Sequence, residues 1–190
     1  MIDILLYVFQ ILLLIILVIT TFLLLLWAIG NVKSKVPFIT TSNAVLEDVS
    51  KALGVKDDSV VYDLGCGDGR ILFYLSRFHP KAKYKGIENR MFPVLLARFG
   101  SFLNVKKNGN RVEIIDGDFF EKDLSDATHV FTYIYPSLMD ELLPKFEKEF
   151  KSGTKLVSLS FKFTNKMPIE EIDLKRNKYQ MGRKLYVYQF

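Results

Sequence analysis

The sequence predicts an α/β domain with a mostly parallel sheet, preceded by one apolar helix that crosses a membrane. Residues 4–29 contain no charged side chain. After them, short apolar strands alternate with helical segments, which is typical of a parallel sheet with helices on both faces. A glycine-rich turn at residues 65–69 follows the first strand. Such a turn lets a ligand approach the backbone closely at the edge of a sheet.

The N-terminal apolar stretch is long enough to span a bilayer, which needs about 20 apolar residues. A cleaved signal peptide would begin with basic residues and have an apolar core of about 7–15 residues. Here Asp3 precedes a longer stretch, and no small-residue cleavage site follows Trp27. A buried helix that is apolar on every side is not expected in so small a domain. We therefore expect residues 1–30 to form a transmembrane helix.

The charges beside this helix indicate its orientation. Lys33 and Lys35 follow it, whereas only Asp3 and the terminal amine precede it. Positive residues favour the cytoplasmic side, so the sequence predicts a single-pass membrane protein with its α/β domain in the cytoplasm. Residues 31–58 are expected to form a linker and a helix that caps the ligand site, and residues 59–190 the domain itself. The chain length allows one such domain.

The elements of the domain are expected in a regular order. A first helix is capped at Thr41, Ser42 or Asn43 and ends at Gly54. Strands follow at residues 60–64, 84–87, 112–115, 129–134 and 155–161, with helices at 70–78, 92–104 and 137–150. Two closing strands at 169–174 and 184–190, joined by a turn that contains Gly182, add an antiparallel edge and bring the sheet to seven strands.

The glycine turn and the strand after it predict a nucleotide-like ligand. The turn reads Asp63-Leu64-Gly65-Cys66-Gly67-Asp68-Gly69-Arg70. Asp63, at the end of its strand, can meet a positively charged amino group. A dinucleotide fingerprint would need Gly or Ala where Arg70 stands, so nicotinamide binding is disfavoured. Glu88 lies 19 residues after Gly69, close to the spacing of about 20 at which a carboxylate holds a ribose diol.

With these residues in place, the chain from Val60 to about Phe161 resembles the class I S-adenosylmethionine-dependent methyltransferases. The resemblance implies a Rossmann-like sheet and S-adenosylmethionine as the cofactor. It also implies that the first motif lies against the methionine part of the cofactor and that Glu88 binds both ribose hydroxyls. The matching first-motif residues are Asp63, Gly65 and Gly67, with Cys66 between the glycines.

The same resemblance assigns the segment after the third strand to the adenine. Asp118 matches the acid that accepts a hydrogen bond from the adenine amino group, and Phe119 would lie beside the ring. The alternative for Asp118 is a turn residue whose side chain points into water. No metal ligand is expected.

A narrower resemblance extends over more of the chain. The stretches Val36-Pro37-Phe38-Ile39-Thr40-Thr41, Tyr135-Pro136 and Gly153-Thr154, combined with a hydrophobic N-terminal helix, are similar to the protein-lysine methyltransferases that modify the ATP synthase c subunit and the adenine nucleotide translocase. The chain is shorter than these mitochondrial proteins and lacks an arginine-rich presequence, like a prokaryotic relative. This resemblance implies Thr40 as a further cofactor contact and a lysine as the methyl acceptor.

Tyr133 and Tyr135, at the end of the fourth strand, are the candidate catalytic residues. Aromatic rings there can line a channel for a lysine side chain and face the sulfonium. If the strand continues through both, they point to opposite faces and only one reaches the pocket; core packing of both is the alternative. Neither His79 nor His129 is placed to act as a base. The strand end lacks the Asn/Asp-Pro-Pro-aromatic signature of enzymes that methylate adenine or glutamine amides.

Three functions remain open at this stage. The leading one is a protein-lysine N-methyltransferase that acts on a membrane-associated protein, with the bilayer contacted through the N-terminal helix. The second is methylation of a lipid or another small membrane-soluble acceptor. The third is a membrane-bound module that binds the cofactor without turnover. Soluble nucleic acid is not expected as a partner. The chain has the expected membrane helix and lacks the Asn/Asp-Pro-Pro-aromatic signature that enzymes methylating adenine carry.

Overall fold

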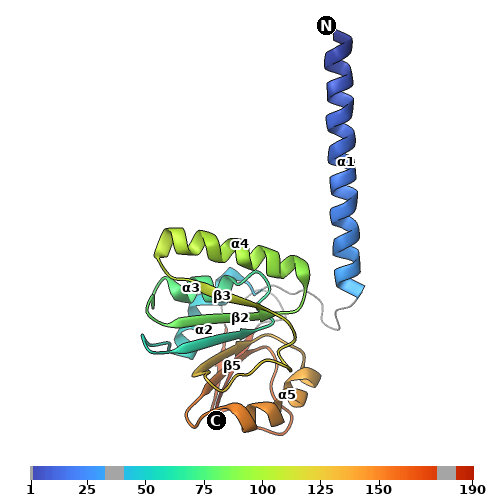
Figure 1. Cartoon of the computed structure of the whole chain (residues 1–190). Helices are drawn as coiled ribbons and strands as arrows, with labels where there is room; N and C mark the ends of the chain where they lie inside the picture. Colours follow the sequence, from blue (N-terminus) through green and yellow to red (C-terminus); the bar gives the residue numbers. More distant parts are fainter. Residues whose placement is uncertain (1, 33–40, 175–182) are drawn as a thin grey trace. The chain divides into compact units, whose positions relative to one another are not determined.

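The computed structural model describes residues 2–32, 41–174 and 183–190. The chain divides into two units, residues 1–37 and residues 38–190. The first unit contains α1 (Ile2–Val32), one unbroken helix (Figure 1). By length and composition, its segment Ile4–Leu25 could cross a membrane, and the side chains of this segment are exposed. The structure thus confirms a single apolar helix, and the crossing itself stays a prediction.

The second unit is built around a seven-stranded sheet, as the sequence predicts. Its order is β3-β2-β1-β4-β5-β7-β6. The first five strands are parallel and β7 runs antiparallel to both β5 and β6. The strands are β1 (Val60–Leu64), β2 (Lys83–Glu88), β3 (Val112–Asp116), β4 (His129–Thr132), β5 (Lys155–Leu159), β6 (Glu170–Asp173) and β7 (Lys184–Gln189).

Strand order fixes where a ligand binds. From β1 the chain moves outward through β2 to β3, then returns to place β4 on the other side of β1. At such a reversal the connections leave the two neighbouring strands in opposite directions, which opens a crevice at their carboxyl ends. Leu64, the last residue of β1, pairs with Thr132, the last residue of β4. The crevice therefore begins directly beyond these two residues.

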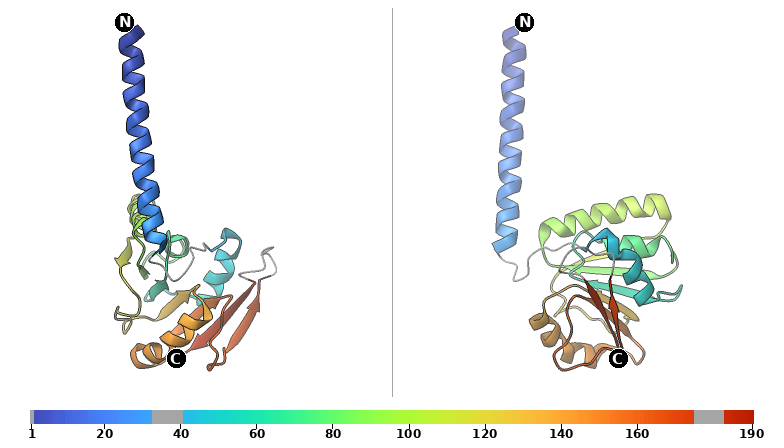
Figure 2. Two further views of the ribbon diagram at one scale, coloured as in Figure 1. Left: turned by 90° about the vertical axis from the view of Figure 1, so that its right-hand side faces the viewer. Right: turned by 180° about the vertical axis from the view of Figure 1, so that it is seen from behind.

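Helices cover both faces of this sheet, as predicted (Figures 1 and 2). One face carries α2 (Leu46–Leu53), preceded by a short 3₁₀ turn (Asn43–Val45), together with α3 (Arg70–Ser76) and α4 (Met91–Asn108). The other face carries α5 (Pro136–Glu149), whose buried residues Met139, Leu142 and Phe146 join the core cluster on that side. The predicted stop of the first helix is confirmed, because Gly54 ends α2 at φ 63°. The Ser42 hydroxyl accepts a hydrogen bond from the Ala44 amide and so caps the 3₁₀ turn, whereas the N-cap of α2 itself is Val45.

Two predicted strand ends are wrong, and both lie at the crevice. β4 ends at Thr132, two residues earlier than expected, because Pro136 begins α5 and Tyr135 serves as its N-cap. β5 ends at Leu159, since Ser160 adopts a left-handed conformation with φ 69°. The predicted turn at Gly182 and the predicted cofactor contact Thr40 lie outside the described residues.

Candidate active site

The glycine-rich turn between β1 and α3 is hydrogen-bonded to the end of β2. Gly65, Gly67 and Gly69 all have left-handed φ values, 77°, 58° and 79°, which cost about 1–2 kcal/mol for a residue with a Cβ. The amides of Gly65 and Cys66 both donate to the Ile87 carbonyl, at 2.9 and 3.0 Å. The turn is therefore held close to the end of β2.

Two carboxylates are buried where β1 and β2 end. Asp63 and Glu88 are each 3% exposed. The Glu88 Oε2 accepts a hydrogen bond from the Gly67 amide at 3.0 Å, and its Oε1 accepts from the Arg90 Nε at 3.1 Å. The structure thus brings the predicted ribose-binding carboxylate against the predicted methionine-binding turn, although the two are 21 residues apart.

The charge of this site fits a cationic ligand. Burial raises the pKa of Asp63 well above its ordinary value, and the charges of Glu88 and Asp68 raise it further. Carboxylates that are held in an interior and repel one another favour an opposite charge nearby. S-adenosylmethionine carries both an ammonium group and a sulfonium group, so the two buried carboxylates suit the charge of that cofactor.

Cys66 and Gly86 form a packing contact beneath the turn. The Cys66 side chain is buried in the core cluster that α2 and α3 share with the sheet, and burial raises the pKa of its thiol. A Cβ at Gly86 would lie 2.7 Å from the Cys66 Sγ. Gly86 is therefore a site-supporting residue that our sequence reasoning missed; a glycine inside a strand is the signal for such a close approach.

Arg70 connects the turn to the segment that precedes α2. Its Nη1 donates to the Thr41 carbonyl at 2.9 Å, and its Nη2 forms an ion pair with the Asp68 Oδ2 at 2.6 Å. Burial alone raises the pKa of Asp68, but the hydrogen bonds and charge of Arg70 outweigh it, so the net shift is downward. The residue that argues against a dinucleotide fingerprint thus has a structural role in this chain.

The predicted adenine-binding segment follows β3. The Gly117 amide donates to the Glu88 backbone carbonyl at 3.0 Å, which places this segment beside the residue that is predicted to bind the ribose. The Asp118 Oδ1 accepts a hydrogen bond from the Phe120 amide at 3.0 Å, so this side chain also stabilises the turn. The half-buried Phe119 ring lies 5.1 Å from the Phe120 ring. Contact of Asp118 and Phe119 with adenine stays a prediction.

Three aromatic rings gather at the carboxyl ends of β4 and β5. We call Tyr133, Tyr135 and Phe161 the aromatic rim. The Phe161 ring centre lies 6.0 Å from that of Tyr133 and 5.6 Å from that of Tyr135. The expected alternation of the two tyrosines does not apply, because β4 ends before both of them. Burial raises the pKa of the Tyr133 phenol, and all three rings are half-buried.

Phe161 reaches the rim because the chain turns sharply after β5. Ser160 has a φ of 69°, a conformation that costs about 1–3 kcal/mol for a residue other than glycine. The Ser158 hydroxyl donates to the Phe161 carbonyl at 2.6 Å, and the Ser160 amide donates to the Lys184 carbonyl at 2.9 Å. Our sequence reasoning placed Phe161 inside a strand and missed this role.

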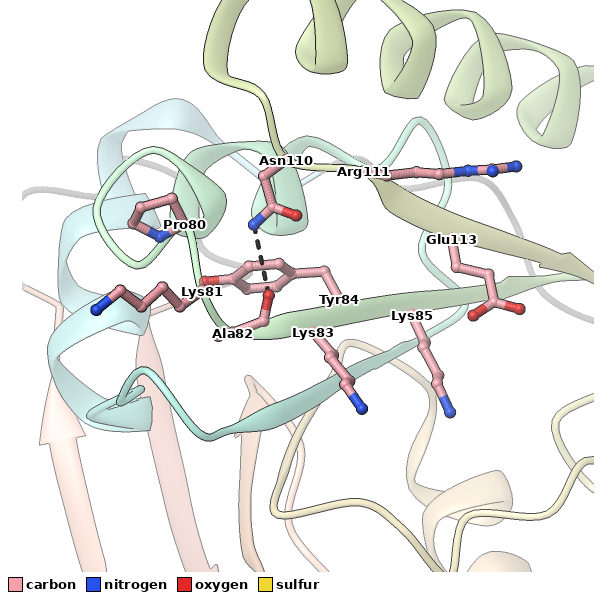
Figure 3. Close-up of a pocket in the computed structure, with 9 residues that line it drawn as sticks. All are labelled: Pro80, Lys81, Ala82, Lys83, Tyr84, Lys85, Asn110, Arg111 and Glu113. Atoms are coloured by element: carbon pink, nitrogen blue, oxygen red, sulfur yellow. Dashed lines mark hydrogen bonds between the residues drawn. The ribbon is translucent and has the colours of Figure 1, made fainter.

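The opposite edge of the sheet has different chemistry. His129 is the first residue of β4, so it lies at the amino end of the strand. Burial, aided by the charge of Lys155, lowers the pKa of His129 to about 4. A cavity of about 500 Å³ lies at the amino ends of β2 and β3. Figure 3 shows the residues that line it, which include Lys83, Lys85 and Arg111. Neither feature adjoins the glycine turn, which lies at the carboxyl ends.

Comparison with known proteins agrees with this geometry. A family model described as the ANTKMT methyltransferase domain matches residues 63–170. A protein-lysine N-methyltransferase of Saccharolobus islandicus (strain REY15A) is 35% identical over 155 residues, which cover 80% of this chain and 92% of that protein.

Solved structures show the same fold. An RNA methyltransferase from Salinibacter ruber, in complex with S-adenosyl-L-homocysteine, superposes with a TM-score of 0.71 at 32% identity, over 80% of this chain and 93% of that one. A precorrin-6y C5,15-methyltransferase from Geobacter metallireducens GS-15 superposes with a TM-score of 0.61 at 16% identity, over 83% and 93%, and supports the fold alone. The family match and the site together make S-adenosylmethionine the cofactor. The chain therefore belongs to the ANTKMT methyltransferase family and is an S-adenosylmethionine-dependent methyltransferase.

Proposed function

We propose that this chain is a protein-lysine N-methyltransferase that acts on a membrane-associated protein. The observation that carries the lysine assignment is the 35% identity to the protein-lysine N-methyltransferase of Saccharolobus islandicus, which extends over 80% of the chain. The ANTKMT family model covers both the glycine turn and the aromatic rim and supports the same reading.

The aromatic rim has the chemistry that a lysine side chain requires. The cofactor, when bound, supplies an electrophilic methyl group. The protein then has to hold an uncharged amine close to that group and exclude water; a strong base is not required. Aromatic faces can contact the alkyl part of a lysine and stabilise positive charge near the nitrogen. Tyr133, Tyr135 and Phe161 lie at the edge of the sheet that also holds the glycine turn.

The apolar helix α1 supports a substrate at the membrane. As a single span it would tether the catalytic domain to one face of the bilayer, and Lys33 and Lys35 favour the cytoplasmic face. Confining enzyme and substrate to one surface raises their encounter frequency without any new contact. A reporter fused after Phe190 should then register as cytoplasmic, and carbonate should not extract the full-length protein. An external C-terminus would contradict this topology.

A labelling experiment tests the lysine assignment. Inverted membranes from a strain that lacks the enzyme are incubated with the full-length protein and S-adenosylmethionine labelled in its methyl group. Protein, lipid and RNA are then separated. We expect label on methylated lysine of a membrane protein, and its loss with a Glu88→Ala variant. Label confined to the lipid extract would instead establish a small membrane-soluble acceptor.

A second candidate function is RNA methylation. The Salinibacter ruber protein, 32% identical over 80% of this chain, is named an RNA methyltransferase. Against it, the end of β4 reads Thr132-Tyr133-Ile134-Tyr135-Pro136, without the Asn/Asp-Pro-Pro-aromatic signature of enzymes that methylate the amino group of adenine. The RNA fraction of the same experiment separates the two functions, because label in RNA alone would exclude the lysine assignment and leave the methyltransferase activity in place.

A further inference from the structure

Helix α4 buries its smaller side chains and exposes its larger ones. The face toward the sheet and α3 is formed mainly by small residues: Val94, Ala97, Ser101 and Asn104 are buried. Gly100 belongs to this side, since a Cβ there would lie 2.6 Å from the Phe73 ring of α3. This face lets α4 pack closely, but it leaves the bulk of the apolar surface of the helix on the outside.

The outer side of α4 is a continuous apolar stripe. Figures 1 and 2 show α4 on the outside of the domain, across the edge of the sheet formed by β2 and β3. Eight large apolar side chains of this helix are between 40% and 62% exposed: Met91, Phe92, Leu95, Leu96, Phe99, Phe102, Leu103 and Val105. Monomeric proteins rarely leave so large an apolar patch in water unless something binds it. At 3.6 residues per turn, these positions point away from the centre of the buried face, except Val105, which lies beside Val94.

The charged residues of α4 and of the chain segments directly next to it are all positive. Between Glu88 and Glu113 the chain contains Arg90, Arg98, Lys106, Lys107 and Arg111 and no acidic residue. The helical spacing puts Arg98 at one border of the stripe and Lys107 at the other. The Lys106 ammonium lies 4.4 Å from the centre of the Phe102 ring, so its alkyl stem covers the stripe.

The apolar stripe and the positive charges beside it together favour one kind of partner. A symmetric dimer through α4 would place the same patch on both subunits, so the positive charges would face one another. Helices that lie in a membrane interface combine Phe and Leu on one side with Lys and Arg beside them, and they bind anionic lipids. We propose that the outer side of α4 is a membrane-docking face that lies in the interface of an anionic bilayer. The proposal does not depend on the identity of the methyl acceptor.

Docking through α4 would set the position of the active site. The helix begins at Met91, three residues after Glu88 at the end of β2. The N-terminal end of the stripe therefore adjoins the edge of the sheet that holds the cofactor. A single span leaves the attached domain free to rotate, whereas a second contact through α4 fixes which edge faces the lipid. The docked domain would hold this edge close to the bilayer surface, where a membrane-associated substrate presents its acceptor group.

Tryptophan fluorescence in the full-length protein tests the docking face. Trp27 is the only tryptophan, so a Trp27→Phe background makes an introduced one unique. One variant carries Phe99→Trp on the stripe, and the matched control carries Lys148→Trp, an exposed position of α5 on the other face of the sheet. Both are reconstituted into vesicles of phosphatidylcholine with or without phosphatidylglycerol, and quenching by lipids brominated along their chains reports contact with the bilayer.

When phosphatidylglycerol is present, we expect the emission of the tryptophan at position 99 to shift to shorter wavelength. We also expect its fluorescence to be quenched several-fold more than that of the control. Adding Lys106→Glu and Lys107→Glu should reduce that quenching. Equal, weak quenching at both positions, with cofactor binding intact, would overturn the docking face. A blue shift without quenching, accompanied by dimers in sedimentation, would show a second copy of the chain on α4 instead and also overturn it.

Discussion

At the scale of single residues, the predicted cofactor site contains two carboxylates that the fold removes from water. Asp63 is the residue before the last of β1 and Glu88 is the last of β2, and each is buried. Glu88 has a second role, because it also holds the Gly67 amide and the Arg90 side chain. The residue that is predicted to bind the ribose therefore also stabilises the shape of the glycine turn.

Replacing Glu88 by Ala should weaken S-adenosylmethionine binding by about 1.5–3 kcal/mol, or roughly 10- to 150-fold in Kd, because hydrogen bonds to a charged acceptor are lost. Isothermal titration calorimetry measures the change. Glu88→Gln is the matched control: it keeps the shape and one acceptor, and we expect a smaller loss. Unchanged affinity in the Ala variant would remove Glu88 from the cofactor site.

Cofactor binding should depend on pH through Asp63. Its pKa in the folded protein is raised above the ordinary value of 3.8, so the neutral form persists to a higher pH than in the unfolded chain. An ammonium group prefers the carboxylate. Binding should therefore weaken as the pH falls through the raised pKa, and binding in that range should release a proton. Calorimetry in two buffers of different ionisation enthalpy measures this release.

The raised pKa of Asp63 also affects the free energy of unfolding. Without cofactor, Asp63 is harder to ionise in the folded than in the unfolded chain, so it lowers the free energy of unfolding once the pH exceeds the unfolded pKa. The full penalty applies above the folded pKa. Asp63→Asn should remove the proton release and also reduce affinity. If release persists in Asp63→Asn, another group carries the pH dependence.

At the scale of elements, the ends of β4 and β5 decide the shape of the acceptor side. Both strands stop earlier than the apolar pattern indicates, one because Pro136 begins α5 and the other because Ser160 is left-handed. These two early ends release Tyr133 and Phe161 from the alternation of a strand. As a result the rim contains three rings, where the pattern alone suggests that one tyrosine reaches the pocket.

Truncating a ring of the aromatic rim should slow turnover and leave cofactor binding unchanged. For Tyr133→Ala, Tyr135→Ala and Phe161→Ala we expect losses in kcat of about 2- to 30-fold each, from about 0.5–2 kcal/mol of contact between ring and cation. Phe78→Ala, at an exposed ring beyond α3, is the control and should behave like the wild type. A fall in cofactor affinity without a change in kcat would place the rim on the cofactor instead.

At the scale of the whole molecule, an apolar helix and a catalytic domain occur in one chain. α1 could cross a membrane by its length and composition, and the family match lies entirely in the second unit. A small catalytic domain has little surface for recognising a large partner. A shared membrane surface reduces that requirement, because it raises the effective concentration of enzyme and substrate.

Removing residues 1–30 should lower methylation of a membrane-embedded substrate by about 100-fold, the lower end of typical gains from effective concentration. Methylation of a detergent-solubilised or peptide substrate should change far less. An unrelated span of equal length and orientation should largely restore activity. Initial rates with labelled cofactor measure all three proteins. Equal losses on both kinds of substrate would mean that α1 supports the domain itself and not encounter at the membrane.

The sequence alone was sufficient for the order of the elements and for the places of the glycine turn and its two carboxylates in that order. The spacing of apolar residues predicts the seven strands and the helices on both faces, because buried positions recur at a fixed interval along each strand or helix. The glycine turn, Asp63 and Glu88 could be predicted because each lies at the end of a strand whose place in the sheet follows from its order. The apolar pattern of α1 identifies a candidate span in the same way.

Only the tertiary structure decided the contacts between segments far apart in the chain. These contacts depend on how the strands pair and where they stop. They are the hydrogen bond between Glu88 and Gly67, the packing of Cys66 against Gly86, the hydrogen bond between Arg70 and Thr41, and the contact of Phe161 with two tyrosines. The outer side of α4 is the clearest case. The sequence predicts a helix at residues 92–104, and only the packing of its small-residue face against the sheet shows that its large apolar residues point outward.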